Sequence, residues 1–213
     1  MAPAVRQQRR KRARRRRILR AAKQVFSQQG FRLTSMEEIA RRAGLSVGAL
    51  YLYFRSKEDL YVALLIDSMQ RFSNALERIR ASDQAPAAKL RAMWDFFYAY
   101  RQQFPASYRI LLRLHDPDLQ EAVSAEVMTD LKRRAAHNFS LAAAIVAEGM
   151  QQGIYQQRSP REVVDVLWSL FIGLVHLSET RQHLGLQVGG LEALHRTAFQ
   201  VLEAGLRVSP PET

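Results

Sequence analysis

The 213-residue sequence contains no cysteine, which excludes disulfides and thiolate metal sites and suits a reducing cytosol. Long apolar runs are missing too. The longest apolar stretch, residues 163–177, is too short to span a bilayer and is interrupted by Asp165, Ser169 and His176. No apolar segment follows the basic N-terminus, so we expect no signal peptide. These absences predict a cytoplasmic protein that does not contact a membrane.

Acidic residues are scarce at the N-terminal end of the chain. Residues 1–65 contain 16 Lys and Arg but only 4 Asp and Glu, whereas residues 66–213 contain 16 of each kind. The whole net charge of +12 therefore lies in the first 65 residues. This asymmetry predicts a polyanionic partner for the N-terminal region, and a neutral partner or none for the remainder.

Strand patterns are missing as well, because no segment alternates between apolar and polar residues over enough length. Apolar residues recur instead at helical spacing along most of the chain. We therefore predict an all-α fold of about nine helices, three in an N-terminal head and six in a C-terminal body. The predicted helices cover residues 14–30, 35–42, 47–53, 57–81, 86–103, 105–117, 118–152, 160–183 and 191–207.

The most informative segment, residues 34–57, reads TSMEEIARRAGLSVGALYLYFRSK. Thr34 and Ser35 each precede a glutamate by three residues, which is a doubled capping-box signal for a helix N-terminus. Gly44 can adopt a positive φ in the following turn, and Ser46 is a good N-cap for the next helix. A helix, a glycine-containing turn and a second helix form the helix-turn-helix motif, whose second helix enters the major groove of DNA.

A wider set of residues extends this motif at fixed spacing. The set comprises Ile18, Leu19, Ala21, Ala22, Phe26, Gly30, Phe31, Thr34, Ser35, Met36, Ile39, Ala40, Ala43, Gly44, Leu45, Ser46, Gly48, Leu50, Tyr51, Tyr53, Phe54, Ser56, Lys57, Glu58 and Leu60. With these residues, positions 14–65 resemble the tetracycline-repressor (TetR) family of one-component transcription regulators. Beyond residue 65 the similarity is one of architecture alone.

The resemblance implies a sequence-specific DNA-binding transcriptional regulator, which we expect to be a homodimeric repressor released by a ligand. Its DNA partner would be a pseudo-palindromic operator, and it would have neither enzymatic activity nor a cofactor. The implied organisation is a disordered basic arm over residues 1–13, a helix-turn-helix DNA-binding domain over 14–60, a helical effector-binding and dimerisation domain over 61–207, and a loose tail over 208–213.

The resemblance also implies which side chains meet DNA. In the family, the position of Tyr51 often reaches the groove and that of Tyr53 often meets a phosphate. Val47 and Ala49 can contact thymine methyl groups, which leaves much of the recognition to phosphates and DNA shape. The predicted DNA-binding residues are Thr34, Ser46, Val47, Gly48, Ala49, Tyr51, Tyr53 and Lys57, with Arg9, Arg10 and Arg12 of the arm.

The arm itself has two interpretations. It can enter the minor groove or lie along the DNA backbone, as basic arms of other DNA-binding domains do. Alternatively, it is a solubilising tail. The compact head of the family begins near Arg14, so the basic residues before this position are additional to the family pattern.

Aromatic residues of the body also have two interpretations. Large residues at helical spacing usually form a plain core, but family members bind small effectors between the body helices, in sites that are mostly apolar. We expect a small apolar or aromatic effector. The candidate lining residues are Trp94, Phe97, Tyr98, Tyr108, Trp168 and Phe171.

The last two predicted helices are apolar over more than one stripe, which a monomer surface would not tolerate. They either bury these stripes within one chain or pair with a second copy, and Gly173 would allow a close approach. The candidate dimer residues are Val164, Leu167, Phe171, Leu174, Leu194 and Val201.

Catalytic and metal-binding patterns are weak. His176, Glu179 and His183 share one helix face, but no further ligand is evident, so we predict no metal site. No arrangement of nucleophile, base and orienting group suggests an enzyme. A protein that compacts nucleic acid without sequence preference remains the alternative to a specific regulator.

Overall fold

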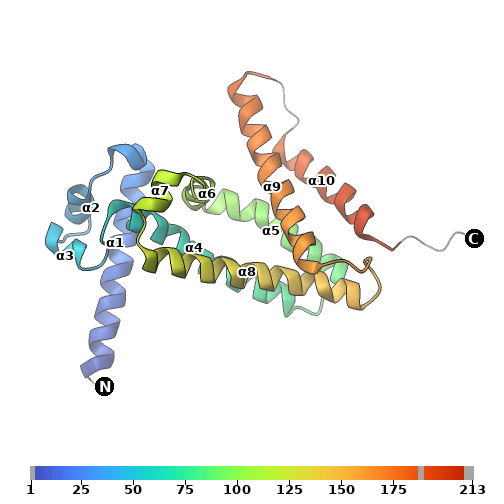
Figure 1. Cartoon of the computed structure of the whole chain (residues 1–213), viewed down its shortest axis with the longest axis horizontal. Coiled ribbons are helices and arrows are strands. Elements are labelled where there is room, and N and C mark those ends of the chain that lie inside the picture. Colours follow the sequence, from blue (N-terminus) through green and yellow to red (C-terminus); the bar gives the residue numbers. More distant parts are fainter. Residues whose placement is uncertain (1–2, 187–189, 209–213) are drawn as a thin grey trace, which may run out of the picture. The chain divides into compact units, whose positions relative to one another are not determined.

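A computed structural model describes residues 3–186 and 190–208, and these ranges contain ten α-helices and no strand (Figure 1). The prediction of an all-α chain is confirmed. Residues 1–2 of the predicted arm, 187–189 of the last loop and 209–213 of the predicted tail lie outside the described residues. The helices are α1 Pro3–Leu33, α2 Met36–Arg42, α3 Val47–Tyr51, α4 Lys57–Arg80, α5 Pro86–Gln103, α6 Pro105–Leu112, α7 Pro117–Ala122, α8 Ala125–Gln151, α9 Pro160–His183 and α10 Leu191–Leu206.

Serine side chains begin four of these helices, as their positions in the sequence predict. The Oγ atoms of Ser35, Ser46 and Ser56 accept hydrogen bonds from backbone N–H groups three residues later, at 3.0–3.2 Å. Ser159 Oγ accepts a longer bond of 3.4 Å at the start of α9. Each bond satisfies a backbone donor that the first turn of a helix leaves unpaired. Gly44, between α2 and α3, has a φ of 62°, which glycine adopts without steric cost.

The arm differs from its prediction, because α1 begins at Pro3 and the expected disorder is wrong for the described part of the arm. Arginine, lysine, glutamine and alanine all have high helix propensity, and the arm continues a helix already nucleated by packing. This gain outweighs the repulsion between like charges. Gly30 has a φ of 76° and interrupts the helix where the sequence predicts its end.

The helix predicted over residues 118–152 is divided into α7 and α8 in the structure. At the break, the backbone N–H of Ser124 donates a 2.7 Å hydrogen bond to Oδ1 of Asp59, a buried residue in the first turn of α4. The break therefore depends on a partner that is distant in the sequence. α3 is also shorter than predicted, since it ends at Tyr51 rather than Tyr53.

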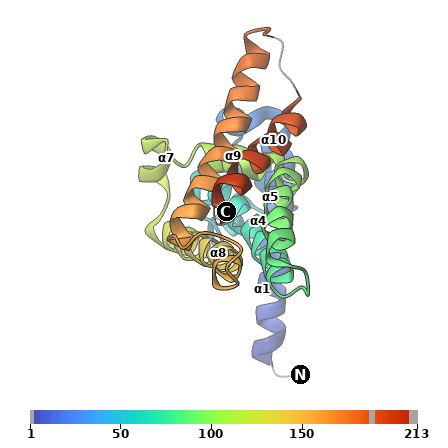
Figure 2. The ribbon, with the colours of Figure 1, turned by 90° about the vertical axis from the view of Figure 1, so that its right-hand side faces the viewer.

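The chain divides into two compact units, each with its own core. Unit 1 comprises Met1–Gln70 and Phe104–Arg134, and unit 2 comprises Arg71–Gln103 and Ala135–Thr213. The core of unit 1 joins the first three helices to the start of α4 and to α6 and α7, through fully buried residues such as Ile18, Ile39, Leu60 and Ile110. In unit 2, α9 and α10 lie side by side in both views (Figures 1 and 2).

Candidate nucleic-acid interface

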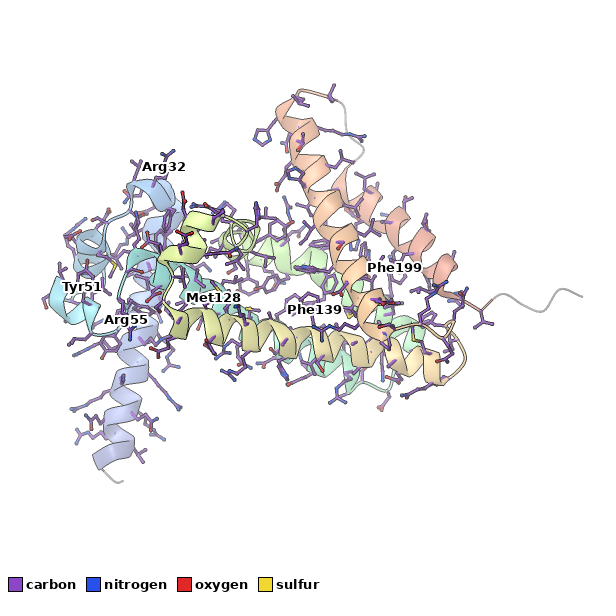
Figure 3. All side chains as sticks on the ribbon, in the orientation of Figure 1. Arg32, Tyr51, Arg55, Met128, Phe139 and Phe199 are labelled. Carbon is purple, nitrogen blue, oxygen red and sulfur yellow. The ribbon has the colours of Figure 1, made fainter. Side chains whose placement is uncertain are left out.

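The orientation of α3 follows from two large residues that anchor it. Leu50 has no exposed surface and Phe54 is 4% exposed, so both lie in the core of unit 1. The opposite side of the helix must therefore face solvent. It presents Ser46, Gly48 and Tyr51, and Tyr51 lies at the edge of unit 1 with 47% of its surface exposed (Figure 3).

Other predicted contacts on α3 are less exposed. Val47, Ala49 and Tyr53 are half-buried, and both Val47 and Tyr53 pack against the core of unit 1. Leu52 is not among the predicted DNA contacts, although helical spacing places it on the exposed side, and it is 83% exposed beside Tyr51.

Thr34 is not brought to the surface. Its side chain is 3% exposed, and Oγ1 donates a 2.7 Å hydrogen bond to the carbonyl oxygen of Gly30. The hydroxyl thus supports the turn between α1 and α2, while Ser35 caps α2. The predicted DNA contact of the Thr34 side chain is therefore wrong.

Lys57 lies at the N-terminus of α4, where positive charge and helix dipole both favour a phosphate. Its Nζ atom is 4.5 Å from the centre of the Phe31 ring. The guanidinium of Arg113, from α6, lies 4.9 Å from the centre of the same ring. A cation held over an aromatic face is partly oriented before any ligand arrives.

The outer half of α1 is basic and lacks carboxylates, because the first acidic residue of the chain is Glu37. Figure 1 shows this half of α1 extending beyond α2 and α3. Beside it lies an open groove of about 700 Å³ that includes Tyr53. The structure brings Arg10 into this groove, whereas Arg9 and Arg12 do not line it. The complete lining is Gln7, Arg10, Lys11, Ala13, Arg14, Arg17 and Tyr53.

The predicted effector residues belong mostly to a cluster of aromatic rings in unit 2. The ring centres of Phe97 and Trp168 are 5.3 Å apart, and those of Trp94 and Phe171 are 6.1 Å apart. Trp94, Phe97 and Phe171 are buried, whereas Trp168 is partly exposed. Tyr108 is also buried, but it belongs to α6 and thus to unit 1.

Trp94 is further fixed by a residue that the sequence did not single out. Its Nε1–H donates a 2.9 Å hydrogen bond to the carbonyl oxygen of His195 on α10, and the two rings stack with centres 4.8 Å apart. Nε2 of His195 lies 3.1 Å from the carbonyl oxygen of Trp94. Burial lowers the pKa of His195, and the neutral imidazole can donate its Nε2 proton to this oxygen. The pair joins α5 to α10. The predicted effector residue Tyr98 also lies here, since its ring centre is 5.1 Å from that of His195.

Three of the predicted dimer residues face the wrong way. Val164, Leu167 and Phe171 are at most 2% exposed, because they form the inward stripe of α9. A side chain buried within its own chain has little surface left for a partner. The apolar residues that point outward are Val166 at 58% exposure, Leu177 at 42% and Val201 at 70%, with Leu170, Leu174 and Leu194 half-buried.

α9 is the one helix in the described part of the chain that could cross a membrane by length and composition, a property it shares with core helices of soluble proteins. Near its end, Glu179 pairs with Arg101 at 2.6 Å, and His183 Nδ1 lies 2.7 Å from the Glu179 carbonyl oxygen. No group of three or more His, Asp or Glu residues among those described is arranged to hold a metal ion.

In a comparison with known proteins, the head of the chain matches a known family. Residues 18–64 match the family described as bacterial regulatory proteins, tetR family. The chain is 28% identical over 139 residues to the transcriptional repressor NicS of Pseudomonas putida, and 30% identical over 122 residues to the transcriptional activator FasR of Mycolicibacterium smegmatis. The segment over residues 18–64 belongs to the tetR family.

The matched segment runs from the inner half of α1 to the start of α4. The alignments span 65% of this chain and 64% of NicS, and 55% of this chain and 56% of FasR. A solved structure of FadR from Bacillus subtilis, in complex with stearoyl-CoA, shares the fold with a TM-score of 0.67 and 20% identity, covering 90% of this chain and 98% of that one. NicS and FasR are both transcriptional regulators. The basic arm before residue 18 lies outside the family match.

Proposed function

We propose that this protein is a homodimeric, sequence-specific DNA-binding repressor that a small apolar or aromatic effector releases from a pseudo-palindromic operator. One observation carries the proposal. α3 is anchored by the buried Leu50 and Phe54, so that Tyr51 and Leu52 project from a unit whose first helix has no carboxylate. A short exposed helix on a strongly basic support matches the geometry and the charge of a major-groove reader.

Base recognition would rest on few side chains. Tyr51 can donate or accept a hydrogen bond at a base edge, and Leu52 can contact a thymine methyl group. Neither residue offers the two-pronged hydrogen bonding of arginine or glutamine. We therefore expect phosphate contacts, including those of Tyr53 and Lys57, and sequence-dependent DNA shape to supply much of the affinity and specificity.

Dimerisation would use the outward apolar stripe of α9 together with α10. Val166 and Leu177 are spaced three helical turns apart on α9, and Val201 is exposed on α10. A Cβ atom added to Gly173, on the same side of α9, would meet nothing within 4 Å in its own chain. Such a surface suits a two-fold contact in which the same residues of both copies meet.

Two dimerised heads would place their recognition helices in successive major grooves, about 34–36 Å apart. The proposed effector would favour a conformation in which this spacing is wrong, and DNA would then weaken effector binding reciprocally. The apolar class of effector is supported by the aromatic residues of unit 2 and by FadR, which was solved with stearoyl-CoA. NicS is a repressor and FasR an activator, and we propose the direction of NicS for this protein. The proposed place of action is the cytoplasm.

Substitution of Tyr51 tests the proposed reading of bases. On the duplex enriched from random sequences, Tyr51→Ala should bind more weakly and should change which base substitutions matter at one position of each half-site. Leu33→Ala is the matched control, because Leu33 is 77% exposed but lies outside α3. Unchanged base preference in Tyr51→Ala, measured by competition with single-base variants, would remove Tyr51 from the proposed readout.

A further inference from the structure

The groove beside α1 has two walls of different origin. One wall is a single face of the outer half of α1, because Arg10, Arg14 and Arg17 are spaced four and three residues apart. The other wall includes Tyr53, which follows α3 directly. Arg17 also donates a long hydrogen bond of 3.5 Å to the carbonyl oxygen of Gly44, in the turn between α2 and α3. The basic face is therefore held against the recognition motif.

The charges in this groove are not neutralised by the other residues that the structure describes. Among the described residues, no carboxylate forms an ion pair with Arg10, Lys11, Arg14 or Arg17, and the helix that carries them has no acidic residue. All four are exposed. Four cations on one side of a concave surface produce a positive potential that attracts an anion chain more strongly than scattered charges do.

The helical state of the arm limits which part of a duplex it can reach. An α-helix with its side chains is about 10–12 Å wide, whereas the minor groove of B-DNA is about 6 Å wide. A helical arm does not fit into the minor groove as an extended arm would. The major groove is wide enough, but the proposed function assigns it to α3. The remaining target is the sugar-phosphate backbone of the DNA, at the edge of the major groove.

We propose that the groove lined by Arg10, Arg14, Arg17 and Tyr53 is a binding site for the phosphate backbone of duplex DNA. The proposal rests on the proposed function, because it places the backbone beside a recognition helix that already lies in the major groove. Arg10 and Arg17 are separated by about 10 Å along the helix axis. Phosphates of one strand advance about 3.4 Å along the duplex axis per nucleotide, so the groove would follow a few consecutive phosphates.

The proposed site makes the arm a helical extension of the reading head rather than a flexible tail. It also assigns unequal roles to neighbouring arginines. Arg10 and Arg14 line the groove, whereas Arg16 and Arg20 are also exposed but do not line it. Net charge alone would make the two pairs equivalent, and the groove makes them different.

The two pairs supply a matched experiment, because each is spaced by four residues. The groove variant is Arg10→Gln with Arg14→Gln, and the control is Arg16→Gln with Arg20→Gln. Glutamine keeps the helix propensity high, and circular dichroism checks that both full-length variants retain the wild-type helix content. Each lost phosphate contact should lower the salt slope of duplex binding by about 0.9. A dimer on its operator would lose four such contacts, so the wild-type to groove-variant affinity ratio should be about 150-fold larger at 50 mM than at 200 mM salt, with a much smaller change for the control.

Neutral phosphates locate the contact on the DNA. Single methylphosphonate substitutions should weaken wild-type binding at two or three consecutive positions of one strand in each half-site, and the groove variant should lose this sensitivity. Equal behaviour of the two double variants, while wild-type protein still binds its operator specifically, would overturn the groove and leave the proposed function intact. A groove variant that loses affinity for single-stranded RNA but not for duplex DNA would also overturn it. Absence of any specific duplex binding by wild-type protein would instead contradict the proposed function.

Discussion

A charge on the outer face of α10 should separate the monomer from the dimer. Val201 is 70% exposed in the single chain, so Val201→Glu should change the stability of a monomer by no more than about 0.5 kcal/mol. In a two-fold dimer the same substitution places two carboxylates in one interface. If burial of each unpaired charge costs about 3 kcal/mol, the dimer loses about 6 kcal/mol, which weakens association more than 10⁴-fold.

Sedimentation measured from nanomolar to high micromolar protein tests this expectation directly. The wild-type chain should be dimeric at micromolar concentration, and Val201→Glu should be monomeric. The variant monomer should be folded and should melt at the same temperature as the wild-type monomer. Leu177→Glu on α9 should behave alike, while Val208→Glu, at a valine 52% exposed beyond α10, is the control. The reasoning is refuted if both Val201→Glu and Leu177→Glu remain dimeric at the wild-type concentration.

Three further substitutions test individual contacts. Lys57→Ala should weaken binding to all duplexes alike and lower the salt slope by about 0.9 for each protomer, or about 1.8 for the dimer, as titrations at several salt concentrations will report. Burial raises the pKa of Tyr155 to about 12, and its buried hydroxyl has no hydrogen-bond partner among the described residues. At pH 8, the free energy of unfolding of Tyr155→Phe should therefore equal that of wild type or exceed it by about 1 kcal/mol. Between pH 10 and 12 the wild-type protein should lose stability, because the phenol ionises in the unfolded chain before it does in the folded one, and Tyr155→Phe should lose less. Burial lowers the pKa of His195, so the imidazole takes up a proton in the unfolded chain before it does in the folded one. The melting temperature of the wild-type protein should therefore fall as pH drops below about 6.5. His195→Asn should show a smaller fall over the same pH range.

Local features of the head could be predicted from the sequence because their partners are near in the chain. Ser46 accepts from the N–H of Ala49, three residues later, and Gly44 satisfies the geometry of a single turn. The inward direction of Leu50 and Phe54 follows from helical spacing. These short-range rules sufficed to recognise the helix-turn-helix.

Features that depend on distant partners were not predictable in the same way. The division between α7 and α8 requires Asp59 to accept from Ser124, 65 residues away. The burial of His195 requires Trp94, 101 residues away. Neither pair has a spacing that a single sequence reveals.

The direction of α9 was ambiguous for another reason. The helix has two apolar stripes, and either one could face its own chain. Packing within unit 2 buries the stripe of Leu167 and Phe171, which leaves Val166 and Leu177 outside. The helical arm illustrates a balance of two terms, since helix propensity and charge repulsion oppose one another and composition alone does not decide between them.

Selection of duplexes from a random pool by the purified full-length protein tests the central claim most directly. A homodimeric major-groove reader predicts one enriched pseudo-palindrome, with half-site centres one helical turn or a multiple of it apart, and about 10³-fold or greater preference over random DNA at a stated physiological salt concentration. Enrichment of no sequence, with equal affinity for every duplex, would contradict the account and favour a protein that binds nucleic acid through charge alone.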